Sequence, residues 1–252
     1  MKKILLSIVM VGLMVGLLAA CGQGGKQGSE EKKIVMGTSA DYPPFETRDN
    51  AGKIVGFDVD LAKKVAEKLG YELEIKDMSF DGLIGALQSG TVDFVASGMT
   101  ATEERKESVD FSTEYIQSEQ MFVTLKDSKV KSMDDLEGAT IGTQLGSIQE
   151  EGAKKLAKKM NIEVKSLNKV PDLIQELKAG RIDAVYLDLA VAQGYVNEAD
   201  LAGFKDESNE TPGMAVAFPK DSKLVSDFNK VIEELQKNGE LEKLNKQWLE
   251  EE

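Results

Sequence analysis

A short polar loop carries the side chains of this chain that are best suited to chemistry. Ser97-Gly98-Met99-Thr100 follows an apolar run at residues 92–96, and Thr102 opens a stretch that contains Arg105. The apolar run predicts a short buried strand, and a threonine before an acidic pair predicts the start of a helix. Hydroxyls, backbone N–H groups and a guanidinium therefore converge where a strand ends and a helix begins. Such a site suits a carboxylate or a phosphate.

The segment before this loop has a counterpart later in the chain. Residues 81–88 form a predicted helix that Gly90 closes, and the same pattern returns ninety positions later. The matched residues are Leu83, Ile84, Leu87, Gly90 and Asp93 with Leu173, Ile174, Leu177, Gly180 and Asp183. Met36-Gly37-Thr38 is likewise matched by Ile141-Gly142-Thr143. Because the order of the surrounding elements also matches, we favour two similarly built lobes over a chance match.

The other elements alternate between strands and helices. Apolar runs predict strands at residues 34–38, 53–57, 72–76, 121–125, 140–143, 182–187 and 214–218. Helices are predicted at 58–69, 150–160, 189–197 and within 224–249. This alternation predicts an α/β fold with two parallel-rich sheets. The second lobe is complete before the last strand, so the chain is expected to cross between the lobes near 121–125 and near 214–218, and the two crossings would form a two-strand hinge.

Composition excludes several classes of function. The 252 residues carry a formal charge of -13, which argues against nucleic acid and against anionic lipid as partners of the protein surface. The chain has no histidine and a single cysteine, Cys21. Histidine-based triads, histidine or cysteine-rich metal sites and an internal disulfide are therefore excluded, and we expect neither a cofactor nor a metal.

The first 33 residues are predicted to lie outside the fold. Two lysines precede an apolar run at residues 4–18, which is too short to span a bilayer comfortably. The following Leu18-Ala19-Ala20-Cys21 resembles the end of a bacterial lipoprotein signal, with an ordinary secretory peptide as the alternative. Residues 1–20 are then the signal peptide, and residues 21–33 are a lipidated cysteine with a flexible polar tether. This predicts a lipid anchor at the extracellular face of the cell membrane, as in Gram-positive bacteria.

Several motifs together resemble one known family. They are Gly56-Phe57-Asp58-Val59-Asp60-Leu61-Ala62, the run from Thr100 to Arg105, Val109-Asp110-Phe111-Ser112 and the strand ending in Asp188. In this order they resemble the polar amino acid-binding proteins of ATP-driven (ABC) importers, and arginine- or basic amino acid-binding members in particular. The resemblance covers residues 34–252 and implies a two-lobed, periplasmic-binding-protein-like type II fold. Its lobes would comprise residues 34–122 plus 217–252 and residues 123–216.

The resemblance implies a clamp for the two charged ends of an amino acid. Arg105 would hold the α-carboxylate, helped by Thr100 and by backbone groups of Ser97 and Gly98. Asp188 would accept a salt bridge from the α-ammonium. From the second lobe, a loop would close on the carboxylate, formed by Ser147, Ile148 and Gln149. These roles agree with the chemistry, because a zwitterion needs a fixed cation and a fixed anion.

The resemblance also implies how the ligand side chain is held. Tyr42 and Phe80 would sandwich it between two rings, an arrangement that suits a flat guanidinium. Ser39 and Gln144 would meet its outer end. Arginine is the first expectation, followed by lysine, histidine or glutamine. Relatives selective for basic residues often have an acid where this chain has Ser39. In this chain the candidates for the missing acid are Asp41 and Glu46.

The same residues allow other interpretations. Arg105 alone fits a surface helix, Phe80 fits a core, and Tyr42 fits ordinary loop packing. An enzyme of the dehydratase type, with Asp188 as general base, is one alternative function, and an amino acid sensor without transport is another. The leading hypothesis is a non-enzymatic, monomeric receptor. Its partners would be an amino acid and the permease subunits of an importer with a cytoplasmic ATPase.

Overall fold

The computed structural model describes residues 32–117, 119–198, 201–207 and 211–249. The predicted signal peptide, the lipidation site at Cys21 and nearly all of the tether lie outside these residues. Strand β1 (Lys32–Thr38) begins two residues before the predicted position. It does so because Lys32 and Lys33 pair in parallel register with Tyr71 and Glu72.

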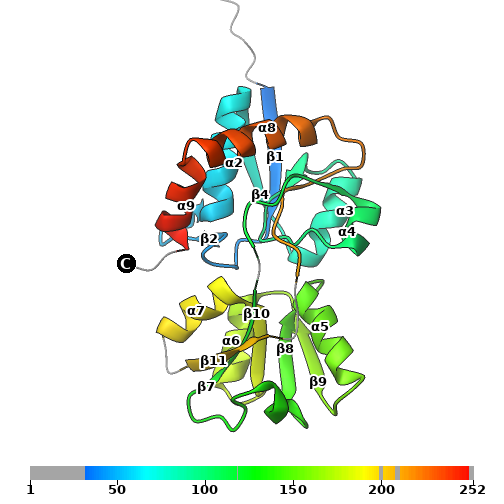
Figure 1. Ribbon diagram of the computed structural model, residues 1–252, viewed down its shortest axis with the longest axis vertical. Helices are drawn as coiled ribbons and strands as arrows, with labels where there is room; N and C mark the ends of the chain where they lie inside the picture. The colour runs from blue at the N-terminus through cyan, green and yellow to red at the C-terminus, as the bar shows by residue number, and fades with distance from the viewer. Residues whose placement is uncertain (1–31, 118, 199–200, 208–210, 250–252) are drawn as a thin grey trace, which may run out of the picture. The chain divides into compact units, whose positions relative to one another are not determined.

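A first sheet has the strand order β4-β1-β5-β12-β6. Its strands are β1, β4 (Tyr71–Asp77), β5 (Phe94–Val95), β6 (Asp110–Phe111) and β12 (Ala217–Phe218). Only β12 runs against the others. The associated helices are α2 (Phe57–Leu69), η1 (Phe80–Gly82), α3 (Leu83–Gln88), α4 (Glu103–Ser108), α8 (Leu224–Lys237) and α9 (Glu240–Trp248). Helices α2, α8 and α9 contact one another beside this sheet (Figure 1). A small hairpin is formed by β2 (Thr47–Arg48) and β3 (Ile54–Val55).

A second sheet has the order β11-β7-β10-β8-β9. Its strands are β7 (Gln120–Leu125), β8 (Thr140–Gln144), β9 (Glu163–Leu167), β10 (Ala184–Asp188) and β11 (Leu201–Asp206). Here β7 alone runs against the rest. The associated helices are η2 (Met133–Leu136), α5 (Ile148–Ala157), α6 (Val170–Lys178) and α7 (Leu189–Glu198). We call the elements built on the two sheets the first lobe and the second lobe.

Two chain segments connect the lobes (Figure 1). One leads from β6 in the first sheet to β7 in the second, and the other returns from β11 to β12. The predicted two-lobed α/β fold with parallel-rich sheets is therefore confirmed. None of the helices in the described part is both long and apolar enough to cross a membrane.

The two copies of the internal sequence repeat form the same hydrogen bond, each in its own lobe. In the first lobe the Asp93 carboxylate accepts a hydrogen bond of 2.7 Å from the backbone N–H of Val35, next to β5. In the second lobe Asp183 accepts one of 2.8 Å from the N–H of Thr140, next to β10. Each aspartate thus ties the start of its own strand to the neighbouring strand of the sheet. Both lobes therefore fix the end of the helix–turn–strand unit with the same aspartate hydrogen bond.

Gly37 and Gly142 occupy corresponding positions in the two lobes, and each allows a helix to pack closely on a strand. A Cβ added to Gly37 would lie 3.3 Å from Cδ2 of Leu83, and one added to Gly142 would lie 3.0 Å from Cδ2 of Leu173. The two leucines are the first members of the repeated helix pattern. Because each helix packs directly on a side-chain-free strand position, a larger residue there would push helix and sheet apart.

The main departures from the predicted elements occur at short strands and sheet edges. The strand predicted at 92–96 is only Phe94–Val95, and that predicted at 214–218 is only Ala217–Phe218. The edge strands β9 and β11 were not predicted. Both are half-buried and mix apolar with polar side chains, so their sequences carry no strong period-2 signal.

Candidate ligand-binding site

A pocket lies between the two lobes. The space between its atoms, including open solvent at its mouth, is about 270 Å³. Both lobes line it, together with Met214 from the return segment; the other lining residues are Tyr42, Phe80, Gly98, Thr100, Arg105, Gln144, Ser147, Ile148 and Gln149. Of the predicted site residues, only Ser39, Ser97 and Asp188 are outside this lining. Ser97 is next in sequence to Gly98, and Asp188 donates its backbone N–H to the hydroxyl of Tyr42. Ser39 is one step further away, hydrogen-bonded to Ser97 and Asp41.

Arg105 is a buried cation on the first-lobe side of the pocket. Helix α4 positions it, since the N-cap Thr102 accepts a hydrogen bond from its backbone N–H at 3.2 Å. Its Nη1 donates to the carbonyl of Thr100 at 2.9 Å, and its Nη2 donates across to the carbonyl of Gly146 at 3.0 Å. The Phe80 ring centroid lies 5.4 Å from Cζ. Arg105 forms no ion pair with any residue in the described part of the chain.

The electrostatics of Arg105 follow from this burial. Only 8% of the residue is exposed. Loss of hydration lowers the pKa of its guanidinium to about 10, against a smaller opposing effect of Glu151 and Glu104. Two carbonyls satisfy two of its five N–H donors but supply no full negative charge. The pocket is therefore positively charged where it meets α4 and suits an anionic group such as a carboxylate.

The second lobe presents the first residues of helix α5 to the same pocket. Ser147 is the N-cap: its Oγ accepts from the N–H of Glu150 at 3.1 Å and donates to the carbonyl of Gln144 at 2.7 Å. Gln149 donates to the side chain of Gln120 at 2.5 Å. Ser147, Ile148 and Gln149 line the pocket at the positive end of the helix dipole. This end adds to the attraction for an anion.

Gly146 lets the loop before α5 approach the first lobe closely. Its φ is +76°, in the left-handed region, and an added Cβ would lie 3.0 Å from Cα of Asp81. Since its carbonyl also accepts from Arg105, a side chain at this position would disturb two contacts between the lobes at once.

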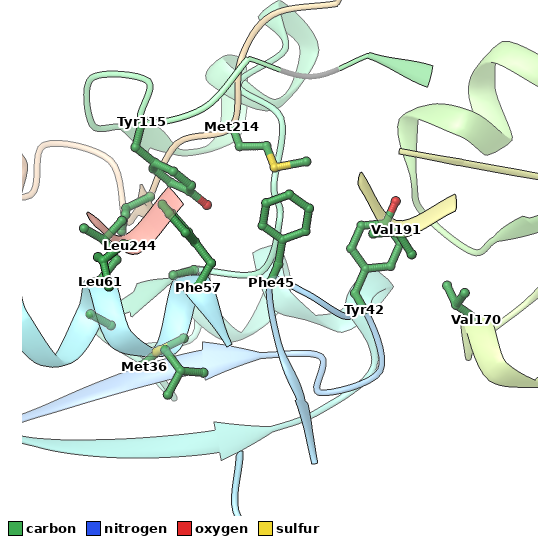
Figure 2. Close-up of a cluster of buried hydrophobic side chains, with 14 of the residues drawn as sticks. Met36, Tyr42, Phe45, Phe57, Leu61, Tyr115, Val170, Val191, Met214 and Leu244 are labelled. Atoms are coloured by element: carbon green, nitrogen blue, oxygen red, sulfur yellow. The ribbon is translucent and has the colours of Figure 1, made fainter. Parts of the chain in front are cut away.

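Tyr42 joins the pocket to Asp188. Its hydroxyl accepts a hydrogen bond of 3.0 Å from the backbone N–H of Asp188, and its ring stacks on Phe45 with centroids 6.2 Å apart. Figure 2 shows the ring between Phe45 and Val191. Burial, and then the nearby Asp188 charge, raise the pKa of Tyr42 well above its usual range, so the phenol stays neutral. Asp188 is 3% exposed, and its Oδ1 accepts from the N–H of Ala190 at the start of α7.

Asp41 forms a second link between the lobes. Its Oδ1 accepts from the Oγ of Ser39 at 3.0 Å and from Nε2 of Gln144 at 3.4 Å. Its Oδ2 accepts from the N–H of Val170 at 3.3 Å, the first residue of α6. Lys169, the N-cap of that helix, makes no side-chain cap bond. Asp41 therefore caps a helix of the opposite lobe, and desolvation by burial raises the pKa of its carboxyl.

Glu46, the other candidate acid, lies elsewhere. It is 0% exposed, and its Oε1 accepts from the Oγ of Ser97 at 2.7 Å. The N–H of Gly98, expected to help hold a ligand, donates instead to Asp58 at 2.7 Å. Sequence reasoning missed this role of Asp58, although the residue belongs to a quoted motif. It also missed Met214, which reaches the pocket through backbone bridges to Thr100 and Ile116 that no local pattern indicates.

No group of three or more potential metal ligands is found among the described residues. The pocket offers instead a buried guanidinium, a helix N-terminus, hydroxyls and amides beside two aromatic rings. Two lobes joined by two segments, with such a pocket between them, define a two-lobed solute-binding protein of the type II periplasmic-binding-protein-like class.

Comparison with known proteins places the chain in a family. Its sequence belongs to the bacterial extracellular solute-binding proteins, family 3, whose sequence profile matches residues 34–251. It is similar to the arginine-binding extracellular protein ArtP of Bacillus subtilis, with 49% identity over 98% of both chains.

Two solved structures are also similar to the chain. The substrate binding protein of an amino acid ABC transporter is 48% identical with a TM-score of 0.82, covering 86% of this chain and 99% of that one. An ancestral arginine-binding protein bound to arginine is 44% identical with a TM-score of 0.81, covering 86% and 98%.

Proposed function

We propose that this protein captures a basic or polar L-amino acid, arginine in the first place, and delivers it to the permease of an ATP-driven importer. The observation that carries the proposal is Arg105, a buried guanidinium at the pocket that has no ion-pair partner among the described residues. An α-carboxylate supplies the missing charge through a bidentate pair. The relative ArtP, similar over nearly the whole chain, is named for arginine binding and supports this choice.

The backbone groups of the ligand are assigned to the two walls of the pocket. Arg105, Thr100 and the start of α5 bind the α-carboxylate. Asp188, which lies behind Tyr42, accepts hydrogen bonds from the α-ammonium. The start of α5 and Arg105 come from different lobes, so a ligand carboxylate held by both draws the lobes together. Closure of this kind buries the ligand and gives the permease a distinct shape to recognise.

The ligand side chain is assigned to the rings and to the polar groups beyond them. Tyr42 and Phe80 enclose its flat part, and Ser39 with Gln144 meets its outer end. Relatives selective for basic residues often carry an acid at the position of Ser39, and in this chain Asp41, rather than Glu46, takes over its role. Its hydrogen bonds to Ser39 and Gln144 support this choice, whereas Glu46 is fully buried behind Ser97.

The setting of the protein in the cell is part of the proposal. Membership of an extracellular family supports a position outside the cell. Lipidation of Cys21 anchors the mature chain to the membrane, and residues 22–31 tether a monomeric receptor within reach of the permease. The lobe boundaries lie before β7 and before β12, the strands with which the chain enters the second sheet and returns to the first. The receptor binds its ligand without transforming it, as a solute-binding protein does.

The test is calorimetric titration of protein lacking residues 1–21 with the twenty amino acids, ornithine, citrulline and cystine. The protein is unfolded and refolded first, so that any bound ligand is removed. We expect one-to-one binding that is tightest for arginine, and chemically unchanged arginine after prolonged incubation. A preference for glutamine or cystine would keep the receptor and reject the cation-selective side-chain subsite. No binding of any amino acid would overturn the proposal, and conversion of the ligand would show an enzyme.

A further inference from the structure

Two buried carboxyl groups support the loop of the pocket from behind. Glu46 accepts a hydrogen bond from the Oγ of Ser97 at 2.7 Å, and Asp58 accepts one from the N–H of Gly98 at 2.7 Å. Asp58 Oδ2 also accepts from the hydroxyl of Tyr115 at 2.8 Å. Two consecutive residues of the loop are thus held by two acids from different elements. Both acids are 0% exposed.

Each acid has one oxygen without a hydrogen-bond partner. These are Oε2 of Glu46 and Oδ1 of Asp58, both fully buried. The two residues are neighbours, because the N–H of Asp58 donates to the carbonyl of Phe45, directly before Glu46. No lysine or arginine among the described residues pairs with either acid. Two buried negative charges side by side, without a cation, would be strongly unfavourable.

One proton resolves both problems. A proton on Oε2 of Glu46 would remove one of the two charges and, with Oδ1 of Asp58 as its acceptor, would satisfy both buried oxygens. The position follows from the neighbours: Asp58 receives two other hydrogen bonds, which stabilise its charged form, whereas Glu46 receives one. We propose that Glu46 and Asp58 share one proton between these two oxygens, and that this singly charged pair holds the Ser97–Gly98 loop in the conformation that lines the pocket.

The electrostatic surroundings favour the protonated form of Glu46. Burial, and then the charge of Asp58, raise its pKa well above the usual range, with smaller contributions from Asp41 and Asp77. Tyr115, the other titratable group against the pair, is a neutral donor. Because the folded pKa lies above the unfolded value, stability from this group is complete below pH 4.5 and decreases as the pH rises through the folded pKa.

Glu46→Gln is the matched test, since an amide keeps the acceptor for Ser97 and replaces the shared proton by an N–H. In the wild type at pH 7 we expect an infrared carbonyl band of a protonated carboxyl group, absent in Glu46→Gln and retained in Glu67→Gln. Glu67 is an exposed residue of the same helix as Asp58. In denaturant titrations from pH 5 to 9, the stability of Glu46→Gln should vary less with pH than that of the wild type.

Ligand affinity tests the positioning role, and this part rests on the proposed function. Glu46→Ala leaves the Ser97 hydroxyl without its acceptor and Oδ1 of Asp58 without a donor, and should weaken arginine binding about tenfold or more, whereas Glu46→Gln should stay within about threefold. Equal affinities for Glu46→Ala and the wild type would overturn the positioning role. Absence of the infrared band would overturn the shared proton even if arginine binds. A wild type that shows the band but binds no amino acid would instead overturn the proposed function alone.

Discussion

Replacement of Arg105 by methionine separates a ligand-binding cation from a structural one. Burial lowers the pKa of this guanidinium well below its usual range, to about 10. One pKa unit corresponds to about 1.4 kcal/mol, so desolvation of the charged form costs about 3 kcal/mol. In the protein without ligand, this cost is offset by hydrogen bonds to the carbonyls of Thr100 and Gly146 and by the smaller attraction of Glu151 and Glu104. A bound carboxylate would recover it as a charge pair.

Two opposite effects follow from this reasoning for Arg105→Met. The free energy of unfolding of the ligand-free protein should stay the same or rise, because a desolvated charge is replaced by an apolar chain of similar length. The affinity for arginine should fall by about 3 kcal/mol, or about 150-fold, since the ligand carboxylate is left without its partner. Every other amino acid that binds should lose a similar factor, because all share the α-carboxylate.

The assay combines calorimetric titration with denaturant unfolding of refolded, ligand-free protein. Lys106→Met is the matched control, since Lys106 follows Arg105 on α4 but is exposed and pairs with Glu103. Arg105→Lys should give an intermediate loss, because it keeps the charge and loses the bidentate fork. Binding by Arg105→Met within about threefold of the wild type would refute the reasoning. So would a loss of folding stability as large as the loss of affinity.

Two further predictions concern Asp41 and Glu176. Asp41→Ala removes the acceptor of Gln144 and the cap of Val170, so arginine should dissociate about 5- to 30-fold faster in stopped-flow measurements; an unchanged rate would contradict a role in closure. Glu176 has its pKa lowered to about 2, first by its hydrogen bonds to Arg181. Its stabilisation is therefore present above pH 4.5 and lost as the pH falls towards 2. Glu176→Gln should be less stable than the wild type at pH 7, and most of this difference should be gone at pH 2, where the Glu176 carboxylate is half protonated. A constant difference between these pH values would count against the ion pair.

Local features of the fold could be predicted because their causes are local. Gly70 ends α2 in the left-handed conformation, with a φ of 73°, at the position the sequence indicates. Thr102 caps α4, and its contact to Arg105 spans three residues. Helix α5 begins at Ile148 rather than at residue 150, because the Ser147 hydroxyl caps it there. Such features depend on few neighbours, so residue type and spacing suffice.

The pocket was predictable to the extent that motifs could be matched. The loop from Ser97 to Thr100, Arg105 and the segment at residues 147–149 meet at one pocket, although they come from different lobes. The residues themselves indicated the chemistry of the first loop, and the family resemblance indicated its partners. The individual roles of these residues remain predictions for the experiments above.

Amino acid order alone determined the alternation of elements, the repeated helix–glycine–strand unit and the cation beside a polar loop. Only the tertiary structure shows which of the two acids, Asp41 or Glu46, lies beside Ser39. The two acids lie five positions apart in one loop, yet Asp41 reaches Val170 while Glu46 is buried against Ser97. Which acid meets the other lobe and which is sealed away depends on packing between segments distant in sequence. Burial and charge pairing are set by those contacts, so no local pattern encodes them.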